Sequence, residues 1–177
     1  MANALTGVRL ALVLPTALAF ASPERLPPGV LLLLLCVAIA TDYFDGPVAR
    51  LRGSASGTGQ LFDHSTDSLF VTAGLTGAAV AGSMTPILPI LIPVAFGQYV
   101  LDSYLWHGRR QLRASAIGRW NGVFYFVPLV LIAGSRMSSA AIVASWLTLA
   151  AGALGYVLVV STVVSVIDRA TAPFRSS

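Results

Sequence analysis

The stretch that decides the fold runs from Thr41 to Asp67 and reads TDYFDGPVARLRGSASGTGQLFDHSTD. The whole chain carries seven acidic residues. Four of them lie in this stretch, namely Asp42, Asp45, Asp63 and Asp67. Long apolar runs flank the stretch on both sides. Ionisable groups near a membrane are costly unless they are paired or bound to a metal, so this stretch is the first candidate for a functional site.

The composition outside this stretch is that of an integral membrane protein. Of the 177 residues, 56% are hydrophobic and 10% are charged, and the mean hydropathy is +0.80. Soluble domains carry about 25% charged residues. The net charge of +4 comes from eleven arginines without any lysine, and these arginines separate apolar runs. We therefore expect no nucleic-acid partner and a single membrane domain over residues 1–177.

Polar and Pro/Gly-rich breaks divide the chain into six apolar segments. Each segment is near the roughly 17–25 residues that a helix needs to cross a bilayer. The sequence therefore predicts an all-α integral membrane protein with six transmembrane helices. The predicted helices are Leu5–Ala21, Val30–Leu51, Gly59–Val80, Ile87–Tyr104, Trp120–Ala133 and Ser139–Ile167.

The arginines predict the orientation of this bundle. Nine of the eleven fall on the side that holds both termini and the acidic stretch. Because positive charge accumulates on the cytoplasmic side, we expect the termini and the site to face the cytoplasm across an inner or plasma membrane. An alternative is that the first segment is a signal peptide, since Arg9 precedes a short apolar run that ends in Ala19-Phe20-Ala21. An even number of spans favours a retained first helix.

The acidic residues form two pairs with helical spacing. Asp42 and Asp45 are three residues apart near the end of one predicted helix, and Asp63 and Asp67 are four apart near the start of the next. A short turn joins the two helices, so both pairs reach the same depth. Clustered carboxylates repel one another, and hard divalent cations such as Mg²⁺ or Mn²⁺ relieve that repulsion. His64 points about 100° away from Asp63 on a helix and is expected to be a bystander.

The residues between the two pairs suit a phosphate group. Gly46 and Ala49 keep one helix face small, so another group can approach the backbone. Arg50 offers a guanidinium group at the depth of the carboxylates. The Gly/Ser-rich turn at residues 53–59 leads into a helix N-terminus, where oxyanions are favoured. Together these features predict a substrate that contains a pyrophosphate.

The spacing Asp42-x2-Asp45-Gly46-x2-Ala49-Arg50-x8-Gly59-x3-Asp63-x3-Asp67 resembles the signature of the CDP-alcohol phosphotransferase family, with all eight fixed positions present. A chance match has a probability of about 10⁻⁸ at average residue usage. The chain length and the six-helix layout resemble the family too. The resemblance implies a metal-dependent enzyme of phospholipid biosynthesis. Such an enzyme transfers the phosphatidyl group from CDP-diacylglycerol to a small alcohol and releases CMP.

The resemblance also implies roles for single residues. Two ions, Mg²⁺ or Mn²⁺, would be held by the four aspartates, and Asp67 would also be the general base on the acceptor hydroxyl. The CDP moiety would contact Gly46, Ala49, Arg50 and Gly59, with Ser56, Asn3 and Thr6 as further contacts. Family members commonly form homodimers. A small-residue face on the third helix permits close packing within the bundle or between protomers; it comprises Ala73, Gly74, Gly77, Ala78 and Ala81.

A second basic stretch, from Trp106 to Asn121, is expected on the same side as the acidic stretch. Its arginines suit either ordinary contact with anionic membrane lipids or bidentate binding of an acceptor phosphate. The acceptor candidates are Arg109, Arg110, Arg113 and Arg119. Family members that use phosphorylated polyols resemble this chain in having basic residues here. We therefore expect glycerol-3-phosphate as the acceptor, followed by inositol phosphate and then serine.

The acidic stretch would also fit a structural protein or a cation transporter. The aspartates would be purely structural if they paired only with arginines such as Arg50 and Arg52. They would form an ion pathway if the protein were a cation transporter, but transporter sites usually lie near the membrane midplane. Release of CMP from CDP-diacylglycerol discriminates between these classes.

Overall fold

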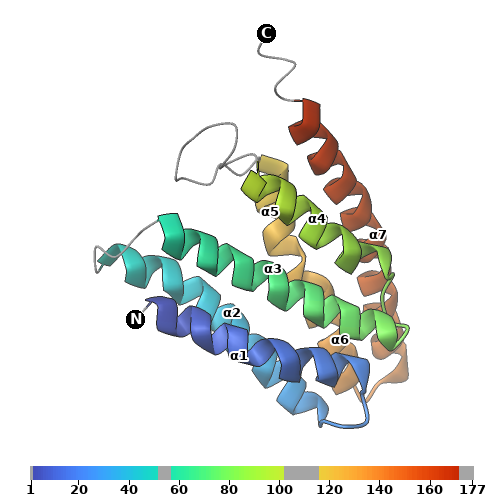
Figure 1. Cartoon of the computed structure of the whole chain (residues 1–177). Coiled ribbons are helices and arrows are strands. Elements are labelled where there is room, and N and C mark those ends of the chain that lie inside the picture. Colours follow the sequence, from blue (N-terminus) through green and yellow to red (C-terminus); the bar gives the residue numbers. More distant parts are fainter. Residues whose placement is uncertain (1, 52–56, 102–115, 172–177) are drawn as a thin grey trace.

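The computed structural model describes residues 2–51, 57–101 and 116–171, and the described chain is helical without strands. Figure 1 shows how its helices pack into one bundle. In chain order they are α1 (Ala2–Ala21), α2 (Pro28–Leu51), α3 (Gly57–Val80), α4 (Ile87–Leu101), α5 (Ala116–Phe124), α6 (Phe126–Met137) and α7 (Ala141–Thr171).

The six predicted helices are all present, and the fifth is interrupted. Its two parts, α5 and α6, are separated only by Tyr125, whose backbone angles (φ −62°, ψ −23°) keep the chain on a nearly helical path. Pro128 explains the interruption, because proline has no N–H to donate to the carbonyl of Phe124. The predicted end of the fourth helix at Tyr104 lies outside the described residues.

The surface of the bundle is apolar, as a membrane protein requires. Two helical segments are long and apolar enough to cross a bilayer, Ile117–Met137 and Ala141–Thr171, and shorter apolar helices accompany them. Several large apolar side chains along α7 are at least 61% exposed, among them Ile142, Trp146, Leu149, Tyr156 and Val160. An apolar stripe of this length is costly in water but is the normal surface of a helix in lipid.

The chain reverses direction so that the start of α1 and the end of α7 lie on one side. Figure 1 shows the α1–α2, α3–α4 and α6–α7 connections gathered at the lower right of the view. The start of α1, the end of α2, the start of α3 and the end of α7 all lie away from that corner. The predicted arrangement, in which both ends of the bundle share a side with the acidic stretch, agrees with this topology.

The packing of α1 against α3 is close enough to need glycine. A Cβ atom at Gly77 would lie 2.2 Å from the carbonyl oxygen of Ala17 and 3.0 Å from the Cβ of Phe20. A Cβ at Gly74 would meet the side chain of Leu129 on α6 at 3.1 Å. Gly74 and Gly77, which belong to the small-residue face of α3, therefore serve packing within the bundle.

Substitution of Gly77 by Ala is therefore expected to lower the melting temperature in detergent by about 5–10 °C, since overpacking costs about 1–3 kcal/mol. The new methyl group would overlap backbone, so α1 has to move. Gly152→Ala is the matched control, because a Cβ there meets nothing within 4 Å. Thermal unfolding followed by intrinsic fluorescence measures both. Equal melting temperatures for Gly77→Ala and the control would contradict the packing argument.

Arg136 connects the C-terminal end of α1 to α6. Its guanidinium donates hydrogen bonds to the carbonyl oxygens of Ala19 and Phe20, each at 2.8 Å. It also lies over the Phe20 ring, 5.4 Å from its centre. These carbonyls belong to the last turn of α1, where no helical N–H remains to pair with them. Arg136 thus holds the position of α1, the helix that also reaches the acidic site.

Candidate active site

Three helices bring charged side chains together on the side of the bundle that holds the acidic stretch. Arg9 of α1 places Nη2 3.2 Å from Oδ1 of Asp42 on α2. Its Nη1 lies 3.1 Å from Oδ1 of Asp63 on α3 and also donates a hydrogen bond to Oδ1 of Asp67. One guanidinium therefore contacts three carboxylates from two helices.

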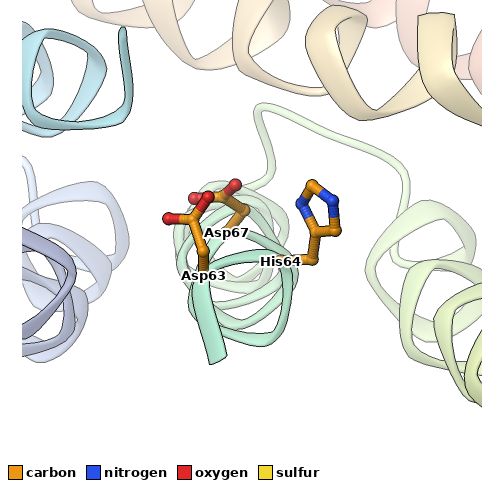
Figure 2. A group of neighbouring side chains, drawn as sticks. All are labelled: Asp63, His64 and Asp67. Carbon is orange, nitrogen blue, oxygen red and sulfur yellow. The ribbon is translucent and has the colours of Figure 1, made fainter. Parts of the chain in front are cut away.

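The carboxylates remain accessible although the guanidinium between them is not. The side chains of Asp42, Asp63 and Asp67 are 41%, 27% and 23% exposed, whereas that of Arg9 is fully buried. Asp63 and Asp67 lie one helical turn apart, and Figure 2 shows their carboxylates next to each other on α3. A ligand can thus reach the carboxylate oxygens from the open side while Arg9 stays behind them.

His64 is closer to this group than its helical position predicts. One of its ring nitrogens, one carboxylate oxygen of Asp63 and one of Asp67 all lie within 4.8 Å of one another. Figure 2 shows the imidazole beside Asp67. The expectation that His64 is a bystander considered only the direction of its Cα–Cβ bond, and the length of the side chain carries the ring back toward the carboxylates.

The donor set fits a hard divalent cation. Three carboxylates face one guanidinium, so the described group has an excess of two negative charges. Carboxylate oxygens, which dominate the described group, suit Mg²⁺ or Mn²⁺, and cysteine is absent from that group. Asp45, the fourth predicted ligand, lies on α2 one turn beyond Asp42, and its side chain is outside the described part of the structure.

A cavity of about 860 Å³ opens beside these carboxylates. The carboxylates of Asp42, Asp63 and Asp67 line it together with His64. Apolar side chains from four other positions of α2, α3, α4 and α6 line it as well: Ile39, Val71, Ile92 and Val130. The cavity therefore offers both charged and apolar surface to one ligand, as an amphiphilic substrate requires.

The same cavity is lined by two arginines, Arg119 of α5 and Arg169 of α7, which we call the basic wall. Arg169 stacks on Tyr99 of α4, with its Cζ 4.9 Å from the centre of the ring. Such stacking orients a guanidinium group. Acidic and basic groups thus line a single space, although they are far apart in the sequence.

Polar contacts join α5 and the adjacent Tyr125 to α7. Ser161 donates to Oδ1 of Asn121 at 2.7 Å, and the hydroxyl groups of Tyr125 and Thr162 share a hydrogen bond at 2.7 Å. Asn121 and Thr162 are buried, where each satisfied hydrogen bond also avoids the cost of an unpaired polar group. These contacts hold the helix of Arg119 against that of Arg169.

The structure brings together some of the predicted site residues. The carboxylates Asp42, Asp63 and Asp67 share one group, and Arg119 lines the adjacent cavity. Thr6 is buried on α1 one turn before Arg9, and Gly59 lies in the first turn of α3. Side chains or whole residues outside the described part are Asn3, Asp45, Gly46, Ala49, Arg50, Ser56, Arg109, Arg110 and Arg113.

Arg9 and Arg169 are the site residues that the sequence did not reveal. The sequence pattern assigns both only to the positive charge on the cytoplasmic side. For Arg9 a signal was present, since an arginine inside an apolar helix needs a partner in the membrane. For Arg169 no local signal exists, because only the folding of α7 against α4 and α5 brings it to the cavity.

Three comparisons with known proteins give one match. A family model described as CDP-alcohol phosphatidyltransferase matches residues 1–168 of the chain. No curated protein and no solved structure matches.

Proposed function

The chain belongs to the CDP-alcohol phosphatidyltransferase family, and from this membership we propose that it transfers the phosphatidyl group of CDP-diacylglycerol to glycerol-3-phosphate with release of CMP. The observation that carries this proposal is the shared cavity. Three carboxylates suited to divalent cations and two arginines suited to an acceptor phosphate line one space of about 860 Å³. The family supports the reaction class, and the cavity supports the choice of substrates.

The donor is expected to lie with its pyrophosphate against the carboxylates. Asp42, Asp63 and Asp67, with Asp45, would hold two ions of Mg²⁺ or Mn²⁺. When bound, these ions would neutralise the pyrophosphate and polarise the reacting phosphorus. Gly46, Ala49, Arg50 and Gly59, with Ser56, Asn3 and Thr6, are proposed to contact the CDP moiety. The apolar side chains of the cavity suit the glycerol backbone and the first carbons of the acyl chains.

Asp67 is proposed to be the general base. The acceptor hydroxyl oxygen attacks the lipid-side phosphorus of CDP-diacylglycerol, and a new P–O ester bond forms. The bond from that phosphorus to the bridging oxygen breaks, and CMP leaves with the electron pair. The hydroxyl proton passes to the carboxylate of Asp67, which is accessible from the cavity and lies one turn from Asp63.

The basic wall favours a phosphorylated acceptor. Arg119 and Arg169 come from different helices and line the cavity together. Two guanidinium groups can bind one phosphate through several charge-assisted hydrogen bonds. Serine carries a carboxylate that two arginines also fit, so serine remains a competitor with inositol phosphate. Arg109, Arg110 and Arg113 precede Arg119 in the sequence and are proposed to extend the wall.

Charge removal at the basic wall is expected to act on acceptor binding. Arg119→Gln and Arg169→Gln should each raise KM for glycerol-3-phosphate at least about tenfold, since a charged hydrogen bond contributes about 1.5–3 kcal/mol. Because neither arginine touches the breaking bond, kcat should change much less. Arg25→Gln, at an exposed position between α1 and α2, is the matched control. An unchanged KM in both variants would remove the basic wall as the acceptor site.

The membrane setting of this proposal is a site that opens to the cytoplasm of an inner or plasma membrane. The start of α1, the end of α7 and the acidic site lie on one side of the bundle (Figure 1), and the sequence pattern predicts that this side carries nine of the eleven arginines. The soluble acceptor and CMP would exchange there while the acyl chains stay in lipid. We also propose a homodimer, on the basis of the family resemblance.

The proposal is tested with radiolabelled CDP-diacylglycerol, purified protein and a panel of acceptors. Glycerol-3-phosphate, inositol phosphate and serine are supplied one at a time with Mg²⁺ or Mn²⁺. We expect label in phosphatidylglycerophosphate and one CMP for each product molecule. Product with another acceptor alone would reassign the acceptor. No CMP release with any acceptor would contradict phosphatidyl transfer.

A further inference from the structure

Arg9 differs from every other charged residue in the described part of the chain. It has no exposed surface, whereas the acidic partners around it are all partly exposed. A buried guanidinium is costly to desolvate and persists only when hydrogen-bonded anions surround it. Here those anions are the carboxylates that the proposed function assigns to the donor site.

The two terminal nitrogens of Arg9 contact different helices. Nη2 is 3.2 Å from Asp42 on α2, and Nη1 contacts Asp63 and Asp67 on α3. The guanidinium fork is planar and rigid, so it sets the distance between the groups that it bridges. The single ammonium group of a lysine at this position would have no such fork. Arg9 therefore links the two helices that supply the carboxylates.

The helix that carries Arg9 is itself held in place. Gly77 lets α1 approach the backbone of α3, and Arg136 binds the last carbonyls of α1. Arg9 thus reaches the carboxylates from a packed helix. Without it, three carboxylates would stand close together with no described cation between them, and their repulsion would push α2 and α3 apart.

We propose that Arg9 is a positioning residue that gathers the carboxylates of α2 and α3 into one preformed site before divalent cations bind. It neutralises one negative charge of the group and leaves the excess that attracts the cations. This inference rests on the proposed function, because the cations concerned are those of phosphatidyl transfer. Arg9 acts through Asp42, Asp63 and Asp67 and makes no contact with substrate in this scheme.

The test is thermal unfolding of the full-length protein in detergent, with EDTA or with saturating MnCl₂. In EDTA, Arg9→Gln is expected to lower the melting temperature by about 10 °C, as expected for a broken buried ion pair. MnCl₂ should restore most of this loss, because the cation replaces the missing positive charge. Arg25→Gln removes an exposed arginine and should match the wild type in both conditions.

Two further variants keep the test decisive. Arg9→Lys retains the charge without the fork and should show a smaller loss in EDTA that MnCl₂ also restores; it replaces Arg9→Gln if that variant does not fold. Adding Asp42→Asn to Arg9→Gln should recover part of the loss in EDTA, since one repelling charge is gone. An Arg9→Lys variant as stable as the wild type in EDTA would overturn the bridging role.

The remaining outcomes separate this inference from the proposed function. A loss of stability that is the same in EDTA and MnCl₂, with no recovery by Asp42→Asn, would show that Arg9 only fills space. Equilibrium dialysis of wild-type protein against MnCl₂ measures cation binding directly. Absence of binding would contradict the metal part of the proposed function, while the recovery by Asp42→Asn in EDTA would still support the positioning role of Arg9.

Discussion

Substitution of Asp67 by Asn is expected to lower CMP release from CDP-diacylglycerol by about 10⁴-fold while the protein stays folded. Asn has nearly the same shape, but its amide neither accepts the proton of the acceptor hydroxyl nor binds a divalent cation as a carboxylate does. Loss of a general base alone costs about 10²–10⁴-fold. Asp67 lines the cavity and is also predicted to be a metal ligand, so the upper end of that range applies.

Two control variants show whether this loss of turnover is specific to the general base. Asp63→Asn removes a neighbouring carboxylate that is not the proposed base, and its activity should recover in part at high Mn²⁺, whereas that of Asp67→Asn should not. Glu24→Gln removes one negative charge at an exposed position away from the cavity and should retain full turnover. Thermal unfolding of each variant checks the fold. Turnover by Asp67→Asn within tenfold of the wild type would remove Asp67 as the base.

Removal of divalent cations is expected to abolish turnover, by at least about 10³-fold, and Mg²⁺ or Mn²⁺ should restore it. The reason lies in the charges of the site. Asp42, Asp63 and Asp67 exceed the positive charge of Arg9 by two. A pyrophosphate placed against this group would be repelled unless cations are added.

The measurement is CMP release after treatment with EDTA, followed by titration with each metal. EDTA already saturated with Mg²⁺ is the control for effects of the chelator on the detergent micelle. The concentration at half-maximal turnover identifies the preferred ion. Wild-type turnover in the continued presence of excess free EDTA would contradict a metal-dependent reaction. It would leave only Asp67 and the arginines to account for catalysis.

The acidic hairpin shows how far the sequence predicts this site. Asp42, Asp63 and Asp67 are predicted to form one cluster because helical spacing and a short turn leave little freedom in their placement. The structure confirms that these three lie together. The chemistry could also be predicted, because each fixed position of the motif has a residue type that phosphate or a metal requires.

The six-helix layout could also be predicted from the sequence. Apolar length decides whether a helix can span a bilayer, and that is a local property of the chain. The interruption at Tyr125 is not predicted, although Pro128 is visible in the sequence. Prolines also stand within α1 and α4 without dividing those helices, so the residue type alone does not predict a break.

The sequence by itself determined the motif and the six apolar helical segments, because spacing and hydropathy depend on residues close together in the chain, and the resemblance of the motif to a known family implied the class of reaction. Only the tertiary structure decided the partners of the carboxylates. Arg9 is more than thirty residues from Asp42, and Arg169 is about a hundred residues from Asp67, so no local pattern relates them. Their roles depend on which helices pack together, and Gly77 permits the close approach of α1 to α3.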